Sequence, residues 1–239
     1  MRWLNYAWKA RQTARFRALH YEYRQHTMIP PEVYAANLQA TLSVHKIPGC
    51  VIECGVWRGG MIAGIAELLG PDRTYHLFDS FEGLPDAKPI DGPAALAYQA
   101  SQDAPGYFDN CRAELREAQD AMARAGVPSV RYHVGWFAQT LPGFTPDDPI
   151  ALLRLDGDWF ESTMTCLTHL VPQMAPGGLI LVDDYYTWDG CCKAVHAYLA
   201  QQNLPLRIRQ THDRVCTLAI PHEQPQSVGM AAPQEAQTP

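Results

Sequence analysis

The chain has 239 residues, of which 47% are hydrophobic, and a formal net charge of −6. This length is enough for one α/β domain with a sizeable core or for two small domains. The negative charge gives the protein no general attraction to nucleic acid or to anionic membranes, so we expect neither as a partner.

Residues 1 to 45 have a helical pattern broken at Pro30-Pro31, and we expect them to form an N-terminal helical extension. The first 25 residues carry six Arg or Lys and one acid, with aromatic and leucine side chains between them. This pattern suits a helix that binds a membrane surface or a partner. It also suits an amphipathic helix that packs on its own domain or on a second subunit, which we favour. We therefore expect a homo-oligomer.

From residue 46 to 221 short apolar strands alternate with helices. Strands are predicted at residues 51–54, 74–78, 130–134, 150–155 and 179–182, and helices at 59–69, 107–124, 161–174 and 190–202. This alternation favours an α/β fold with a doubly wound, Rossmann-like parallel sheet. Two further strands, at residues 206–209 and 215–220, flank a tight turn and predict an antiparallel hairpin at the edge of the sheet.

Two segments show no core pattern. Residues 82–106 are rich in Gly, Pro, Ala and Asp, so we expect a long loop that closes over a bound ligand as a lid. Residues 222–239 are polar and rich in Pro and Gln, and they predict a disordered tail.

The seven cysteines are odd in number and form no Cys-x-x-Cys unit. Such usage fits reduced thiols better than a disulfide framework or a zinc site. No apolar run approaches the roughly 18 residues of a membrane span. The N-terminal residues lack the uninterrupted apolar core of a secretory signal. We therefore expect a cytoplasmic protein without a membrane span.

Four aspartates follow two of the predicted strands. Asp156 and Asp158 come after the strand at 150–155, and Asp183 and Asp184 after the strand at 179–182. Ligands of open α/β sheets bind at the carboxyl ends of such strands. Clustered carboxylates repel one another unless a cation lies among them, and oxygen ligands favour Mg²⁺. The alternative is that these aspartates are helix N-caps, although one at each strand end would suffice.

A glycine-rich turn with Glu53, Gly55, Gly59 and Gly60 joins the first strand to its helix. Its spacing differs from the dinucleotide fingerprint, and it lacks the Gly-Lys-Ser/Thr of a P-loop. Asp79 follows the second strand 24 residues after Gly55, where an acid either binds ribose hydroxyls or caps the next turn. Because Glu53 would repel a pyrophosphate but suit a cation, the turn favours S-adenosylmethionine.

Five motifs in chain order resemble those of the macrocin and mycinamicin O-methyltransferases, a family with an aminocoumarin-sugar O-methyltransferase among its relatives. They are Val51–Gly60, Phe78–Pro85, Gly135–Pro142, Leu153–Thr163 and Gly177–Tyr185. The resemblance spans about residues 27 to 220. It implies an enzyme that depends on S-adenosylmethionine and Mg²⁺ and methylates a hydroxyl on a sugar of a natural product.

The resemblance also implies roles for single residues. Asp156, Asp183 and Asp184 match the metal ligands, and Asp158 matches the general base. The positions that match the cofactor site are Glu53, Gly55, Asp79, Ser80, Gly135, Trp136 and Phe137, and the glycine-rich turn adds Gly59 and Gly60.

The chemistry of methyl transfer accounts for these residue types. A bound Mg²⁺ lowers the pKa of an alcohol, and a carboxylate such as Asp158 accepts its proton. A catechol-like phenol is an alternative acceptor, because the same chemistry would serve it. A second alternative is a non-catalytic cofactor-binding protein that acts through its basic N-terminal helix. This alternative is disfavoured because such a protein has no need of Asp158.

Overall fold

The computed structural model describes residues 2–103, 105 and 107–222, with the backbone alone for residues 2–9. The described strands form one sheet in the order β3-β2-β1-β4-β5-β7-β6. Five of them are parallel: β1 (Cys50–Cys54), β2 (Tyr75–Asp79), β3 (Val130–Val134), β4 (Ile150–Leu155) and β5 (Met174–Val182). The last two, β6 (Ile208–Gln210) and β7 (Cys216–Ala219), pair antiparallel at one edge. The prediction of a doubly wound sheet with an antiparallel edge hairpin is confirmed.

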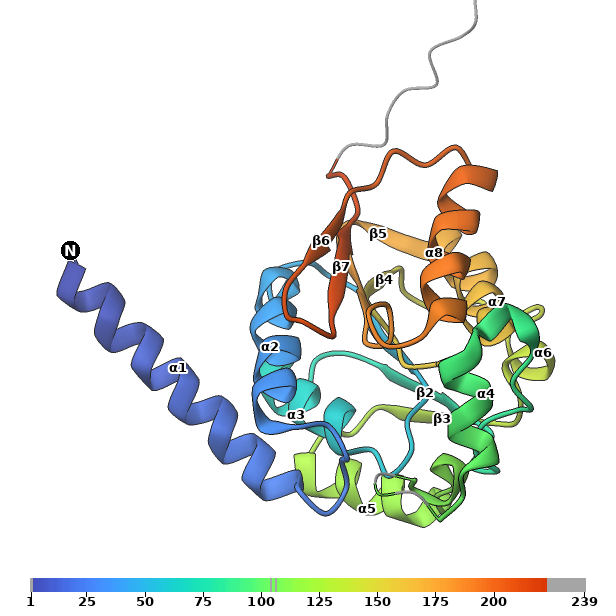
Figure 1. The fold of residues 1–239 in the computed structure, drawn as a ribbon. Helices are drawn as coiled ribbons and strands as arrows, with labels where there is room; N and C mark the ends of the chain where they lie inside the picture. Colours follow the sequence, from blue (N-terminus) through green and yellow to red (C-terminus); the bar gives the residue numbers. More distant parts are fainter. Residues whose placement is uncertain (1, 104, 106, 223–239) are drawn as a thin grey trace, which may run out of the picture.

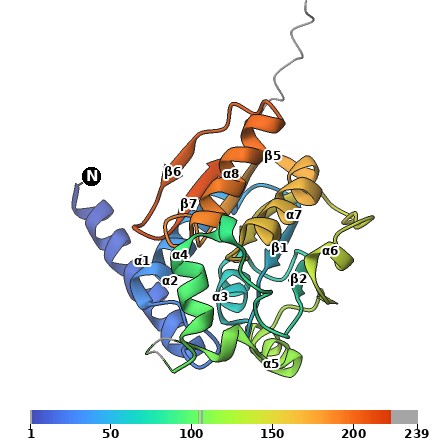
Figure 2. The same ribbon diagram turned by 45° about the vertical axis from the view of Figure 1, so that its right-hand side comes forward.

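Helices cover both faces of the sheet (Figures 1 and 2). One face carries α1 (Arg2–Tyr23), α2 (Pro31–Thr41), α3 (Gly60–Leu69) and α5 (Leu115–Ala125). The other carries α6 (Phe137–Thr140), α7 (Phe160–Leu170) and α8 (Asp189–Gln201). Because β1, β4 and β5 have helices on both sides, they are almost wholly apolar, as buried parallel strands are. None of the described helices is both long enough and apolar enough to span a membrane.

The two helices before residue 46 differ in their contacts. Val33, Tyr34 and Leu38 of α2 are buried in the same core as the sheet. In α1, Phe16, Leu19 and Tyr23 are buried against this core at helical spacing. The N-terminal end of α1 leads away from the sheet (Figure 1). The second half of α1 therefore packs on its own domain. The domain boundaries at residues 45/46 and 221/222 stay predictions.

The prediction that residues 82–106 lack secondary structure is wrong. This segment contains the 3₁₀ turn η2 (Pro89–Asp91) and the helix α4 (Pro93–Ala100). Pro89 and Pro93 open these helices, where a missing N–H does no harm, and Gly92 joins them with φ +90°. Part of the proline and glycine content that suggested a loop therefore marks the starts of helices.

Two helix boundaries also differ from prediction. Helix α5 begins at Leu115 rather than residue 107, because the 3₁₀ turn η3 (Asp109–Cys111) has left-handed backbone. Helix α7 ends at Leu170 rather than residue 174, since β5 already begins at Met174. The predicted disordered tail lies, from residue 223 on, outside the described residues.

Candidate active site

A cavity of about 670 Å³ lies at the carboxyl edge of the parallel strands. Residues that follow β1 to β5 line it, together with residues 26–30 before α2 and parts of the segment from 83 to 111. Its volume falls in the usual range of small-molecule sites.

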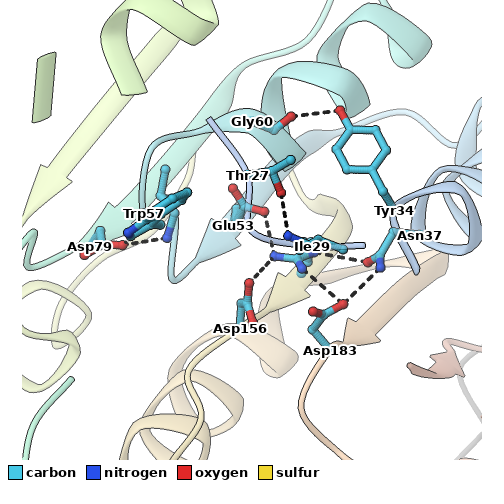
Figure 3. A network of polar contacts seen from close by, with 12 residues as sticks. Thr27, Ile29, Tyr34, Asn37, Glu53, Trp57, Gly60, Asp79, Asp156 and Asp183 are labelled. Atoms are coloured by element: carbon cyan, nitrogen blue, oxygen red, sulfur yellow. Dashed lines mark hydrogen bonds and ion pairs between the residues drawn. The ribbon is translucent and has the colours of Figure 1, made fainter. Parts of the chain in front are cut away.

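Arg154 of β4 lies at the floor of this cavity and is 1% exposed. Its Nη1 lies 2.9 Å from Glu53 Oε1 and 2.9 Å from Asp156 Oδ2, and its Nη2 lies 3.1 Å from Asp183 Oδ1. These three acids converge from three adjacent strands (Figure 3). A buried charge needs such partners. Arg154 was not predicted as a site residue, although a single charged residue inside an apolar strand indicates a buried charge that needs partners.

Asn37 of α2 is a second residue that the sequence did not reveal. Its Nδ2 donates hydrogen bonds to Asp183 Oδ1 at 2.9 Å and to the Val33 carbonyl at 3.0 Å, and its Oδ1 accepts one from Arg154 Nε at 3.1 Å. The side chain is fully buried (Figure 3 shows it beside Asp183). It joins an N-terminal helix to Arg154 of β4 and to Asp183, which follows β5.

The four aspartates that follow β4 and β5 meet at the cavity, as expected. The backbone N–H of Asp158 donates to Asp184 Oδ2 at 3.2 Å, and Trp188 Nε1 donates to Asp158 Oδ1 at 2.8 Å. Burial, and then the neighbouring Asp156, raises the pKa of Asp158 well above its usual range. Burial and then Asp158 do the same to the pKa of Asp184, and burial raises that of Asp183 against the opposing charge of Arg154.

The helix-cap alternative for these aspartates is wrong. The N-cap of α7 is Trp159 and that of α8 is Trp188, and neither helix has a side-chain hydrogen bond from its own N-cap residue. The acids instead face one another at the cavity. Their arrangement calls for a source of positive charge.

The donor set fits Mg²⁺ in its chemistry. Within the described part of the chain, no three His, Cys, Asp or Glu side chains already form a group that could hold a metal ion. Arg154 takes one oxygen of Asp156 and one of Asp183, which leaves each a second oxygen, and Asp184 adds another carboxylate. All these donors are oxygens, the type that hard divalent cations prefer.

Asp79 organises the glycine-rich turn. Its Oδ2 accepts the N–H groups of Val56 at 2.6 Å and Trp57 at 2.8 Å, and its Oδ1 accepts that of Phe81 at 2.7 Å (Figure 3 shows the contact with Trp57). Burial raises the pKa of Asp79, while these hydrogen bonds oppose the rise. Asp79 also lines the cavity, so its carboxylate holds the turn at the edge of the ligand site.

The three predicted glycines of this turn differ in their surroundings. Gly55 lines the cavity with φ +87°, and a Cβ there would lie 1.9 Å from the Asp156 carbonyl oxygen. Gly59 and Gly60 do not line the cavity. Gly59 is the N-cap of α3 and has φ +81°. The Gly60 N–H donates to the His26 carbonyl, and the Gly60 carbonyl accepts a hydrogen bond from the Tyr34 hydroxyl (Figure 3 shows the latter). These two glycines serve packing.

The remaining predicted cofactor residues do line the cavity: Glu53, Ser80, Gly135, Trp136 and Phe137. Glu53 is fully buried, and its Oε2 has no hydrogen-bond partner among the described residues. Burial raises the pKa of Glu53 to about 8, against the opposing charge of Arg154. An unpartnered carboxylate oxygen in a cavity suits the cationic end of a ligand.

We predict that Asn37→Ala lowers the free energy of unfolding by about 1–3 kcal/mol, because it leaves Arg154 Nε and Asp183 Oδ1 each short of a partner. Urea denaturation measures this change. Thr41→Val is the matched control, since Thr41 is also buried in α2 but donates only to the Asn37 carbonyl. Equal losses in the two variants would show that the links to Asp183 and Arg154 contribute little.

Known proteins are similar to this chain in sequence. Mycinamicin III 3''-O-methyltransferase of Micromonospora griseorubida is 37% identical over 163 residues, which cover 64% of this chain and 61% of the relative. Demethyldecarbamoylnovobiocin O-methyltransferase of Streptomyces niveus is 37% identical over 164 residues, 66% of this chain and 60% of the relative. The chain thus spans about three-fifths of the length of these relatives.

Solved structures agree in fold. The O-methyltransferase NovP superposes with a TM-score of 0.69 at 30% identity and 82% coverage of both chains. The calicheamicin methyltransferase CalS11 superposes with a TM-score of 0.58 at 25% identity, over 88% of this chain and 91% of the other. The family model for macrocin-O-methyltransferase (TylF) matches residues 7–218, which include every residue of the acid cluster. The chain belongs to the macrocin-O-methyltransferase family.

Proposed function

We propose that this protein transfers a methyl group from S-adenosylmethionine to a hydroxyl on a sugar of a natural product, with Mg²⁺ as a second cofactor. The observation that carries the proposal is the meeting of four aspartates with a glycine-rich turn in one cavity. Membership of the family and the O-methyltransferase names of its relatives support it.

The cavity has groups suited to each part of S-adenosylmethionine, which supplies a methyl group on a positively charged sulfur when bound. The free Oε2 of Glu53 suits its cationic amino acid end. Asp79 lines the cavity and suits the ribose hydroxyls. Gly55 lets the ligand approach the backbone, and Trp136 and Phe137 offer ring faces to the adenine.

Asp156, Asp183 and Asp184 would hold Mg²⁺, which lowers the pKa of a hydroxyl that it binds. Arg154 restrains two of these three carboxylates, so they are already oriented before a cation arrives. The ordering of side chains that binding usually requires is correspondingly reduced.

Asp158 is the base in this proposal. Trp188 holds its Oδ1, which leaves Oδ2 to accept the proton of the acceptor hydroxyl. Fixed orientation of the two reactants in the cavity lowers the barrier further.

The names of relatives favour a sugar acceptor over a phenol. One relative from Streptomyces olivaceus, 35% identical over 171 residues, is named as a 4'-O-methyltransferase of a tetracenomycin that carries a dimethoxy-rhamnosyl group. We extend this acceptor class to the present chain. The catechol-like phenol and the non-catalytic cofactor-binding protein are the alternatives that the experiments below separate.

We further propose that the protein acts in the cytoplasm as a homo-oligomer. All seven cysteines are free in the structure, as in a reducing compartment. The N-terminal end of α1 leads away from the sheet, and its sequence there contains Trp3 and Trp8 (Figure 1). A helix rich in aromatic residues gains from a second surface to cover it.

One prediction of this proposal concerns the binding of the cofactor and the methylation of an acceptor. Calorimetry should show binding of S-adenosylhomocysteine and none of NAD, because Glu53 would repel a pyrophosphate. With S-adenosylmethionine and Mg²⁺ the protein should methylate p-nitrophenyl α-L-rhamnoside, and EDTA should abolish the reaction. If the protein methylates catechol in preference to the rhamnoside, the acceptor is a phenol and not a sugar. Cofactor binding without methylation of either acceptor would favour the non-catalytic alternative.

A second prediction separates the base from the metal ligands. Asp158→Asn keeps an oxygen for Trp188 but cannot accept a proton, so turnover should fall by roughly 10²–10⁴-fold at every Mg²⁺ concentration. Asp184→Asn removes a charged ligand, so high Mg²⁺ should restore part of its activity. Rescue of the first variant and not the second would mean that the two roles are exchanged.

The third prediction tests self-association. Light scattering of the full chain should give a multiple of the chain mass of 26.7 kDa. A variant that lacks residues 1–12 should contain fewer chains per particle. This deletion ends before Phe16, which is the first buried residue of α1 among those whose side chains the structure describes. A monomeric full chain would contradict the proposed oligomer.

A further inference from the structure

We propose that Asp91 is a positioning residue that holds the turn carrying Asp158 from outside that turn. This inference rests on the proposed function, because it assigns the turn its role in methyl transfer. Asp91 ends η2 in the segment that the sequence suggested was a loop. Along the chain it precedes Phe160, the residue of α7 to which it bonds, by 69 residues.

Both carboxylate oxygens of Asp91 accept a backbone hydrogen bond. Oδ1 accepts the N–H of Phe160 at 2.7 Å, and Oδ2 accepts the N–H of Lys88 at 2.7 Å. The residue is 3% exposed. A buried carboxylate with these short, charge-assisted bonds holds two distant segments of backbone together.

Helix α7 needs this contact because it has no cap of its own. Its N-cap residue, Trp159, makes no side-chain hydrogen bond to the helix, and Phe160 is its first residue. The first N–H groups of any helix lack partners within the helix, and a negative charge near them is stabilising. Asp91 therefore caps α7 from another part of the chain.

The turn before α7 is strained and is held at two points. Asp158 has φ +55°, a conformation that side chains other than glycine adopt at an energetic cost. The indole of Trp159 is buried and donates to the Pro85 carbonyl at 2.8 Å. Pro85 and Asp91 thus bind consecutive residues directly after Asp158. Such a conformation persists only where its surroundings fix it.

Asp91 also lies against the start of α8. A Cβ on Gly190 would be 2.2 Å from Asp91 Oδ1, so α8 has a glycine where the carboxylate enters. Lys193 of α8 donates to the Ile90 carbonyl at 2.8 Å. Trp188, which holds Asp158, directly precedes α8. Asp91 therefore sits between the start of the helix after Asp158 and the start of the helix after Trp188.

Loss of this carboxylate should affect turnover and leave cofactor binding intact. The residues proposed for the cofactor lie in or directly after β1, β2 and β3, whereas the carboxylate of Asp91 bonds to Lys88 and Phe160. Asp158 would lose the restraint on its turn, and small displacements of a base reduce turnover strongly.

The experiment compares Asp91→Ala with Asp91→Asn. Asn keeps Oδ1 for the Phe160 N–H but presents an amide nitrogen to the Lys88 N–H. With p-nitrophenyl α-L-rhamnoside we expect kcat to fall roughly 10- to 100-fold in the Ala variant and less in the Asn variant. The KM for S-adenosylmethionine should stay within about twofold of wild type in both variants, because binding and orientation are separate contributions.

Met122→Ala is the control for general destabilisation. Met122 is buried in α5 and does not line the cavity, so this variant should lower Tm and leave kcat unchanged. If Asp91→Ala keeps wild-type kcat at a temperature where it is folded, the proposal is overturned. The same holds if Met122→Ala loses kcat to the same extent, since stability alone would then explain the effect.

A second arm needs no acceptor. Hydrogen exchange followed by mass spectrometry should show that the peptide containing Phe160 exchanges faster in Asp91→Ala than in wild type, and more slowly in Asp91→Asn than in Asp91→Ala. The affinity for S-adenosylhomocysteine should be unchanged. If wild type methylates neither rhamnoside nor catechol, the proposed function fails, and this arm still decides whether Asp91 holds the turn. Unchanged exchange at Phe160 in the Ala variant would overturn the inference.

Discussion

The buried guanidinium of Arg154 is the interaction on which the site depends. It contacts Glu53 of β1, Asp156 after β4 and Asp183 after β5, and these strands are neighbours in the sheet. Removal of an acid from water is costly unless a partner compensates it. Three acids share this one cation. The proposed binding of Mg²⁺ and of a sulfonium rests on this surplus of carboxylates over guanidinium.

The helices before β1 belong to this electrostatic centre. Asn37 of α2 bonds to both Arg154 and Asp183, and Tyr34 of the same helix bonds to the Gly60 carbonyl at the start of α3. The part of the chain that looks like an extension in the sequence therefore contributes a polar side chain to the floor of the site. The segment after β2 contributes in a similar way through Asp91.

The features that sequence predicted are those encoded by local patterns. Apolar runs revealed the strands, and because parallel strands end at one edge, the meeting of Asp156 with Asp184 followed. Asn37 and Asp91 act through partners more than 60 residues away, and no local pattern records such contacts. Helix α4 was missed because proline and glycine serve both loops and helix starts. Gly60 was assigned to the cofactor although it makes room for the His26 backbone.

The separation of the Arg154 partners along the chain bears on synthesis at the ribosome. Glu53 emerges 101 residues before Arg154, and Asp183 is made later still. A nascent chain that ends before β4 has no Arg154 to compensate the buried Glu53 of β1. The buried acid of β1 therefore gains its partner only after β4 has been made.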